Sequence, residues 1–266
     1  MLEKILGARR AVWDKTPLIH CITNPISIND CANYVLSAGA KPFMAEHPDE
    51  VRDITAMSDA LALNIANITD ARLCSIEISA KTADKNNIPS VIDVVGIGVS
   101  KLRYDYVLRL LDETHFSAIK GNIAEIRALL GLDTRTVGID VAEKTRLEDN
   151  VRIVMQLAKK YRCTILASGE NDIVSDGENL YAVSNGRREM SLVTGTGCVL
   201  NVLCAVYMSV GDALTGCVAA ASVLGIRGGL ADASRGMASY RADMLDKFYT
   251  LTDERISENI RLKKLI

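Results

Sequence analysis

A run of small residues, Thr194-Gly195-Thr196-Gly197-Cys198, comes directly before a segment with a helical apolar pattern at residues 199–210. The first N–H groups of a helix lack partners within the helix and carry the positive end of its dipole. Glycine also lets a ligand approach the backbone closely. The turn therefore has the chemistry of an anion hole for a phosphoryl group. Such turns are also common as plain connections, and no Gly-Lys-Ser/Thr follows, so this is not a Walker loop.

Two carboxylates that are far apart in the sequence stand next to predicted strand ends. Asp93 ends an apolar strand, and Glu125 opens a helix just after another strand. The carboxyl ends of parallel strands converge on one crevice, where two such oxygen ligands suit Mg²⁺ with its retained waters. From the residues alone a second interpretation stands equally. Asp93 would then cap a turn, and Glu125 would complete a helix capping box with Asn122.

Lys120 lies one residue before Gly121 and is predicted to face the same crevice. A cation at this place can hold the phosphates of a nucleotide. The alternative is an ordinary solvated surface lysine, which is the default for a single lysine.

The elements that must position these groups are visible as short β-rich runs alternating with longer segments of helical spacing. This alternation is typical of βαβ units and a mostly parallel sheet with helices on both faces. The predicted strands are residues 18–23, 41–44, 60–65, 90–94, 116–120, 164–168 and 172–175, and the predicted helices include 27–38, 49–57, 70–85 and 146–161.

The ends of the chain add to this prediction. Residues 1–13 have an amphipathic helical pattern, and from Gly197 onward the chain is predicted to be almost wholly helical. The sequence Asp-Gly-Glu-Asn at 176–179 predicts a hairpin turn, so the late strands should be antiparallel edges. No linker, repeat or charge block divides the chain. We therefore interpret residues 1–266 as a single α/β domain.

Composition narrows the functional class and the compartment. Of 266 residues, 48% are hydrophobic and 24% charged, as in an ordinary globular protein. With 31 basic and 33 acidic residues, there is no electrostatic footprint for nucleic acid or an anionic membrane. The seven cysteines contain no Cys-x-x-Cys pair, and the run at 199–210 is too short to span a bilayer. We expect a cytoplasmic protein in a reducing environment.

Several segments together resemble one known family. Besides the run at 194–198, they are PLIHCITN at 17–24, GAKPFMA at 39–45, IDVVGIG at 92–98, IKGNIAEI at 119–126 and, more loosely, residues 236–246. In this order they are similar to the hydroxyethylthiazole kinases, a thiamine-salvage branch of the ribokinase-like kinases. The similarity extends over nearly the whole chain.

The resemblance implies a ribokinase-like fold and ATP-dependent phosphorylation of the hydroxyl of 4-methyl-5-(2-hydroxyethyl)thiazole, with Mg²⁺ as cofactor. It implies that Asp93 and Glu125 organise the metal through water. It places Lys120 and Ser168 at the ATP phosphates, where Ser168 stands in place of the family's usual Thr. The anion hole would be formed by Gly195, Thr196 and Gly197.

By the same resemblance, the acceptor pocket is lined by Asn24, Ile26, Met44, Gly195 and Cys198. Cys198 stands where the wider superfamily has an Asp as base. Because a helix N-terminus lowers the pKa of a thiol, we expect a thiolate that accepts or orients the alcohol proton. Loose phosphoryl transition states need little help from a base, however, so proton acceptance is the weaker part of this hypothesis.

The resemblance also implies a ring-shaped homotrimer with the acceptor pocket at the subunit boundary. The high hydrophobic and low aromatic content is consistent with more apolar helix faces than are needed to cover one sheet. Closed rings bury such faces in heterologous interfaces between subunits.

Besides Ser168, four residues depart from the family pattern, and one of them is Ser100, which stands where Thr is usual. Val94 replaces a proline, which should free a backbone donor and loosen the turn after Asp93. Ala66 and Asn67 replace Gly and Thr, which suggests an altered acceptor preference. Other hypotheses remain open at this point: a kinase for another small hydroxymethyl heterocycle, an ATP- or ADP-dependent dehydratase on the same fold, a dinucleotide oxidoreductase, and a non-catalytic nucleotide sensor.

Overall fold

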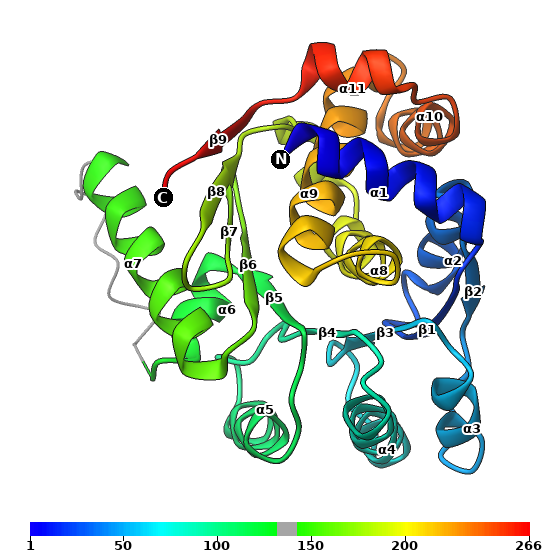
Figure 1. Ribbon diagram of the computed structural model, residues 1–266, viewed down its shortest axis with the longest axis vertical. Helices are drawn as coiled ribbons and strands as arrows, with labels where there is room; N and C mark the ends of the chain where they lie inside the picture. The colour runs from blue at the N-terminus through cyan, green and yellow to red at the C-terminus, as the bar shows by residue number, and fades with distance from the viewer. Residues whose placement is uncertain (132–142) are drawn as a thin grey trace.

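A nine-stranded sheet forms the centre of the molecule in the computed structural model, which describes residues 1–131 and 143–266 (Figure 1). In spatial order the strands are β2 (Lys41–Phe43), β1 (Leu18–Ile22), β3 (Ala60–Asn64), β4 (Ser90–Asp93), β5 (Ala118–Asn122), β6 (Thr164–Ser168), β7 (Asp172–Ser175), β8 (Leu180–Val183) and β9 (Leu262–Lys264).

The strands from β2 to β6 are parallel to their neighbours, whereas β7, β8 and β9 are paired antiparallel. The predicted hairpin is confirmed. The carboxylate of Asp176 accepts from the amides of Glu178 and Asn179, and Gly177 has a φ of 95°, which glycine adopts without strain. The short strand β9 was not predicted, because it has three residues and leaves two of them exposed.

Helices cover both faces of the sheet (Figure 1). One face is packed by α3 (Val51–Ala56), α4 (Asp70–Lys85), α5 (Lys101–Glu113), α6 (Ile123–Ala128) and α7 (Glu143–Tyr161). The other is packed by α1 (Leu2–Lys15), α2 (Ile28–Ser37), α8 (Thr196–Met208) and α9 (Ala213–Leu230), with α10 (Met237–Tyr249) and α11 (Asp253–Asn259) outside them. A short 3₁₀ helix, Arg188–Leu192, leads to α8.

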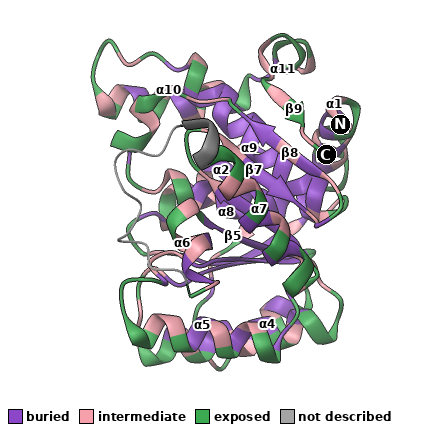
Figure 2. Cartoon of the chain, turned by 90° about the vertical axis from the view of Figure 1, so that its left-hand side faces the viewer, coloured by how far each residue is buried: buried purple, intermediate pink, exposed green. Residues whose placement is uncertain are grey.

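The alternation of side chains along each strand divides the core into two clusters. Ala62 and Val91 belong to the cluster under α8 and α9, whereas Leu63 and Ile92 belong to the cluster over α4 and α5. Figure 2 shows the buried strands and α8 and α9 in purple between more exposed helices. A strand buried on both faces reads as a continuous apolar run, which is why these strands were recognisable in the sequence.

Within residues 1–131 and 143–266, the longest apolar helix is α9, and not the run at 199–210. This helix of 18 residues is long and apolar enough to cross a membrane. However, 83% of its residues are buried inside the fold, as in the core helix of a globular domain. Asp212 caps this helix by accepting from the amide of Thr215 at 2.8 Å.

Most predicted elements occur, with shifted ends. β5 begins two residues later than expected, α8 begins at Thr196 instead of 199, and α5, capped by Ser100, was not predicted. The amphipathic helix at the N-terminus is confirmed as α1. All seven cysteines are free thiols.

The contact between α8 and α9 generates a stability prediction. A Cβ at Gly216 would lie 2.6 Å from Cγ and 2.9 Å from the backbone N of Met208, whereas a Cβ at Gly7 in α1 would meet nothing within 4 Å. We expect Gly216→Ala to lower the free energy of unfolding by about 1–3 kcal/mol through overpacking. We expect Gly7→Ala to raise it by roughly 0.5–1 kcal/mol through helix propensity. Urea unfolding of both variants measures the difference, and equal effects would contradict the close helix packing.

Candidate active site

Asn64, Asp93 and Lys120 lie side by side at the carboxyl ends of three neighbouring parallel strands, and we call them the polar row. Asn64 of β3 is in register with Asp93 of β4, which is in register with Lys120 of β5. Ala62, two residues before Asn64, belongs to the core beneath α8. Because side chains alternate along a strand, the polar row points to that same face, toward the beginning of α8.

Lys120 forms a buried ion pair with Asp93. Its Nζ lies 2.7 Å from Oδ2 of Asp93 and donates a second hydrogen bond, of 3.1 Å, to the carbonyl oxygen of Gly197. Burial acts to lower the pKa of Lys120, but Asp93 outweighs it and the pKa is raised. Lys120 is therefore charged although only 4% exposed, and its interpretation as a surface lysine is wrong.

Gly197 makes room for this ammonium group. A Cβ at Gly197 would lie 3.2 Å from Nζ of Lys120, tighter than ordinary packing allows. The ion pair thus extends from the sheet into the first turn of α8.

Asn64 connects the ion pair with Cys198. Its Nδ2 donates to Oδ2 of Asp93 at 3.2 Å and to Sγ of Cys198 at 3.6 Å, and its Oδ1 accepts from the amide of Ala66 at 2.8 Å. The sequence analysis did not assign Asn64 a role. Its place at the end of a predicted strand, like that of Asp93, was the signal that could have found it.

The thiol of Cys198 lies in the first turn of α8, half-buried. Burial, and after it the Asp93 carboxylate, raise its pKa, although the hydroxyls of Ser27 and Thr23 and the cation of Lys120 favour the thiolate. The pKa is thus shifted in the direction opposite to the one expected from the helix end, with burial as the main cause. This shift favours the neutral thiol.

Glu125 forms the capping box that was the alternative interpretation. Its Oε2 accepts from the amide of Asn122 at 2.7 Å, and its own amide donates to Oδ1 of Asn122 at 2.9 Å. Oε1 accepts from the amide of Gly96 at 2.9 Å. A Cβ at Gly121 would lie 3.2 Å from Oε2, so glycine is needed there. Burial, with Asp93 adding to it, raises the pKa of Glu125.

The two carboxylates fit a hard cation that keeps its water. Asp93 and Glu125 lie close enough to interact electrostatically, and Oδ1 of Asp93 is buried without a hydrogen-bond partner. Within residues 1–131 and 143–266, no three His, Cys, Asp or Glu side chains are grouped to hold a metal. This donor set suits Mg²⁺ completed by water and phosphate oxygens, and not a zinc centre enclosed by protein ligands.

A cavity of about 820 Å³ adjoins the beginning of α8. Thr196 and Gly197 line it from the helix, and Asn122 and Ser168 line it from the ends of β5 and β6. Ser168 is held by a hydrogen bond of 3.3 Å from its hydroxyl to the carbonyl oxygen of Gly121. Two residues of the predicted anion hole, Thr196 and Gly197, therefore share one cavity with Ser168, whereas Gly195 and Lys120 do not line it.

The cavity also contains charged residues that the sequence analysis missed. Arg187, Arg188 and Arg261 line it, as does Asp172, whose pKa burial raises to about 6. These residues come from the hairpin, the approach to α8 and the segment before β9. No motif links them in the sequence, so only the fold reveals this charged lining, which also includes Glu170.

The predicted acceptor residues lie near the other side of the turn before α8. Gly195 has a φ of 90°, and a Cβ there would lie 2.9 Å from Cβ of Ser27. The turn before α2 is closed by Oδ1 of Asn24, which accepts from the amide of Ile26 at 3.1 Å, and Ile26 is 71% exposed. Met44 packs, as Cys198 does, against the core under α8.

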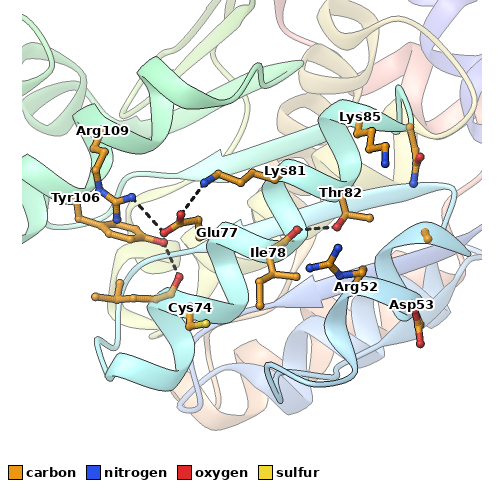
Figure 3. A pocket seen from close by; sticks show the side chains of 13 residues that line it. Arg52, Asp53, Cys74, Glu77, Ile78, Lys81, Thr82, Lys85, Tyr106 and Arg109 are labelled. Carbon is orange, nitrogen blue, oxygen red and sulfur yellow. Dashed lines mark hydrogen bonds and ion pairs between the residues drawn. The ribbon is translucent and has the colours of Figure 1, made fainter.

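A second groove, of about 780 Å³, lies on α3, α4 and α5 (Figure 3). Its Glu77 is held by Lys81 and Arg109, and the ring of Tyr106 lies under the guanidinium of Arg109. These helices cover the other face of the sheet from α8. The groove contains none of the predicted site residues.

Comparison with known proteins identifies the family. The sequence model of the Hydroxyethylthiazole kinase family matches residues 10–254. The chain belongs to the hydroxyethylthiazole kinase family. It is 44% identical to hydroxyethylthiazole kinase 2 of Clostridium botulinum strain Hall over 96% of this chain and 98% of that protein. It is 43% identical to the hydroxyethylthiazole kinase of Finegoldia magna over 100% of this chain and 98% of that protein.

Solved structures agree with this membership. A hydroxyethylthiazole kinase protein from Pyrococcus horikoshii OT3 superposes with a TM-score of 0.91 at 29% identity, covering 99% of this chain and 100% of that one. A pyridoxal kinase from Staphylococcus aureus in complex with ADP superposes with a TM-score of 0.65 at 10% identity, covering 93% and 98%. The latter shows the fold alone, and the predicted ribokinase-like α/β fold is confirmed.

Local hydrogen bonds fix the backbone at the positions that depart from the family pattern. The amide of Val94, which proline would lack, donates to the carbonyl oxygen of Lys120 at 2.9 Å, so the expected free donor and loosened turn do not occur. The segment with Ala66 and Asn67 is fixed by two arginines. Arg103 donates to the carbonyl of Ala66 at 2.5 Å, and Arg72 donates to that of Asn67 at 2.9 Å.

The raised pKa of Cys198 predicts slow alkylation. A group with a raised pKa carries less thiolate at neutral pH, so iodoacetamide should label Cys198 more slowly than the exposed Cys74 at pH 8. The labelling rate should rise about tenfold per pH unit up to at least pH 9. Asn64→Leu, which removes a donor to the sulfur, should slow it further.

Peptide mass spectrometry measures both cysteines in one sample, with Cys74 as internal reference. A labelling rate of Cys198 that is already independent of pH below pH 8 would show a preformed thiolate.

Proposed function

We propose that the protein phosphorylates the hydroxyl group of 4-methyl-5-(2-hydroxyethyl)thiazole with ATP, in thiamine salvage. Family membership supports the reaction type. The observation that carries the proposal is the polar row under the first turn of α8, with Cys198 at one end and the cavity of about 820 Å³ beside Gly197. The first turn of α8 thus lies between Cys198, which is proposed to face the alcohol, and the cavity that is proposed to hold the nucleotide.

The anion hole accepts the transferred phosphoryl group in this proposal. The amides at Gly195, Thr196 and Gly197 have no partner within α8 and point out of its positive end, where phosphoryl charge is stabilised. Lys120 stands directly behind them, fixed by Asp93 and the Gly197 carbonyl. The helix end and the cation therefore act on the same anion.

The nucleotide occupies this cavity. Ser168 faces the phosphates from the cavity wall, where Arg188 and Arg261 supply positive charge. Lys120 acts on the phosphates from behind Gly197, to whose carbonyl oxygen it donates at 3.1 Å. Asp93 and Glu125 hold Mg²⁺ through water, and the ion supplies charge neutralisation for the phosphates when bound.

Cys198 orients the alcohol. As a neutral thiol it can donate to or accept from the substrate hydroxyl, and Asn64 fixes the sulfur from behind. Because a phosphoryl transition state with a largely broken bond to the leaving group needs little base assistance, the alcohol proton can leave after the new P–O bond has formed.

The acceptor pocket is completed by a neighbouring subunit of a homotrimer. Ile26, a proposed pocket residue, is 71% exposed in the single chain, and an apolar side chain at a small apolar site is expected to be covered.

Seven free thiols support the cytoplasm as the place of action.

ADP release tests the reaction and the two carboxylates. With ATP and Mg²⁺, hydroxyethylthiazole should support turnover better than a hydroxymethylpyrimidine, the substrate class of the rival kinase hypothesis. Asp93→Asn should lower kcat by about 100-fold or more, because the transition state loses a fixed charge. Glu125→Gln separates two roles, since glutamine can still complete a capping box but carries no charge.

A metal role for Glu125 predicts a lower kcat and a higher Mg²⁺ requirement in Glu125→Gln, at nearly unchanged thermal stability. Asp105→Asn, which alters an exposed carboxylate paired with Lys101, is the matched control. Wild-type turnover in Glu125→Gln at every Mg²⁺ concentration would show that Glu125 is only a capping residue. A preference for the pyrimidine over hydroxyethylthiazole would contradict the proposed substrate.

Light scattering tests the assembly. The protein should have three times the 28.9 kDa mass of the chain. Ile26→Asp should raise the KM for the alcohol by about tenfold or more, with a smaller change in the KM for ATP. The control is Met57→Asp, which alters another exposed apolar residue. Met57 precedes the amino end of β3, whereas Ile26 follows the carboxyl end of β1. A fully active 28.9 kDa species would rule out a shared pocket.

A further inference from the structure

Helix α9 contains one charged residue in an otherwise apolar sequence, and that residue is completely buried. Arg227 lies in the last turn of the helix and is 0% exposed. Long cationic side chains are almost never fully buried unless they are paired. Nothing in the proposed kinase reaction uses this residue.

Among residues 1–131 and 143–266, the guanidinium group of Arg227 has no partner. All three of its nitrogens, Nε, Nη1 and Nη2, are buried there without a hydrogen-bond acceptor. Arg72, which is 4% exposed, shows how this chain treats another buried arginine. Its nitrogens donate to the carbonyls of Asn67 and Thr23 and to the carboxylate of Glu46.

The charges around Arg227 make its isolation more costly. Burial, and after it the nearby cations Arg9 and Arg255, lower the pKa of Arg227 to about 10, so it remains protonated at neutral pH. Arg9 is already engaged by Asp253 and the carbonyl of Leu251. The same Asp253 also accepts from Arg10 at 3.1 Å, so its negative charge is shared.

A buried guanidinium without an acceptor is strongly destabilising, and a protein interior neutralises such a charge with a counter-ion. The described residues around Arg227 supply further cations instead. Tyr207 of α8, fully buried and near both Arg9 and Arg227, adds a phenol group to the same place.

We propose that Arg227 is the centre of a buried binding site for a small inorganic anion, chloride in particular, where α9 packs against α1 and α11. Because Arg227 is 0% exposed, the proposal is confined to a small anion. The anion supplies the missing acceptor and neutralises the cluster of Arg9, Arg227 and Arg255. This site is separate from the nucleotide cavity, which α9 lines with other residues, among them Leu224 and Gly225.

Thermal unfolding at constant ionic strength tests the proposal. The Tm of the wild type should rise by about 3–5 °C per tenfold increase in chloride when chloride replaces gluconate, a large organic anion. Arg227→Met, which keeps the side-chain volume and removes the charge, should abolish this dependence on chloride. In gluconate, its Tm should be higher than that of the wild type. Arg72→Met is the control, and it should lower the Tm equally in both salts.

Crystals of the wild type grown in bromide give a second readout that needs no variant. An anomalous peak within hydrogen-bond distance of the Arg227 guanidinium is the expected result. Ordered water alone at that position, or a wild-type Tm that responds to chloride in the same way as that of Arg227→Met, would overturn the proposal.

Discussion

The buried ion pair between Lys120 and Asp93 is the interaction on which the candidate site depends. It joins two neighbouring strands, and through the hydrogen bond from Lys120 to the Gly197 carbonyl it ties the sheet to the first turn of α8. A buried pair of this kind is weak evidence for stability, because desolvation offsets much of the attraction. Its value here lies in position, since it fixes a positive charge behind the helix end that is proposed to receive a phosphoryl group.

The fold was largely predictable because its strands are buried on both faces. Such strands appear in the sequence as apolar runs, and the predicted strand at 164–168 coincides with β6. The exposed strand β9 has no apolar signature, and its pairing with β8 is a long-range event that local patterns do not record. Helix α5 was missed for a similar reason, since only three of its residues are buried.

Some residues of the candidate site were predictable from the sequence, whereas Asn64, the charged residues of the cavity wall and the electrostatic environment of Cys198 were not. Asp93, Lys120 and Glu125 were assigned to one crevice because parallel strands end at one edge. The environment of Cys198 was not predictable, because the helix end is visible in the sequence whereas the burial and the neighbouring carboxylate that raise its pKa are not. Arg227 shows the same limit, since a lone arginine in an apolar helix does not reveal whether it has a partner.

The missing side chain of Gly197 makes the charge of a residue on another element sensitive to this position. A Cβ at 197 would lie 3.2 Å from the ammonium group of Lys120, so a larger side chain would press on the cation that neutralises Asp93. A buried carboxylate whose counter-ion is weakened favours its protonated form. A substitution at 197 would therefore act on the charge of Asp93 without touching that residue.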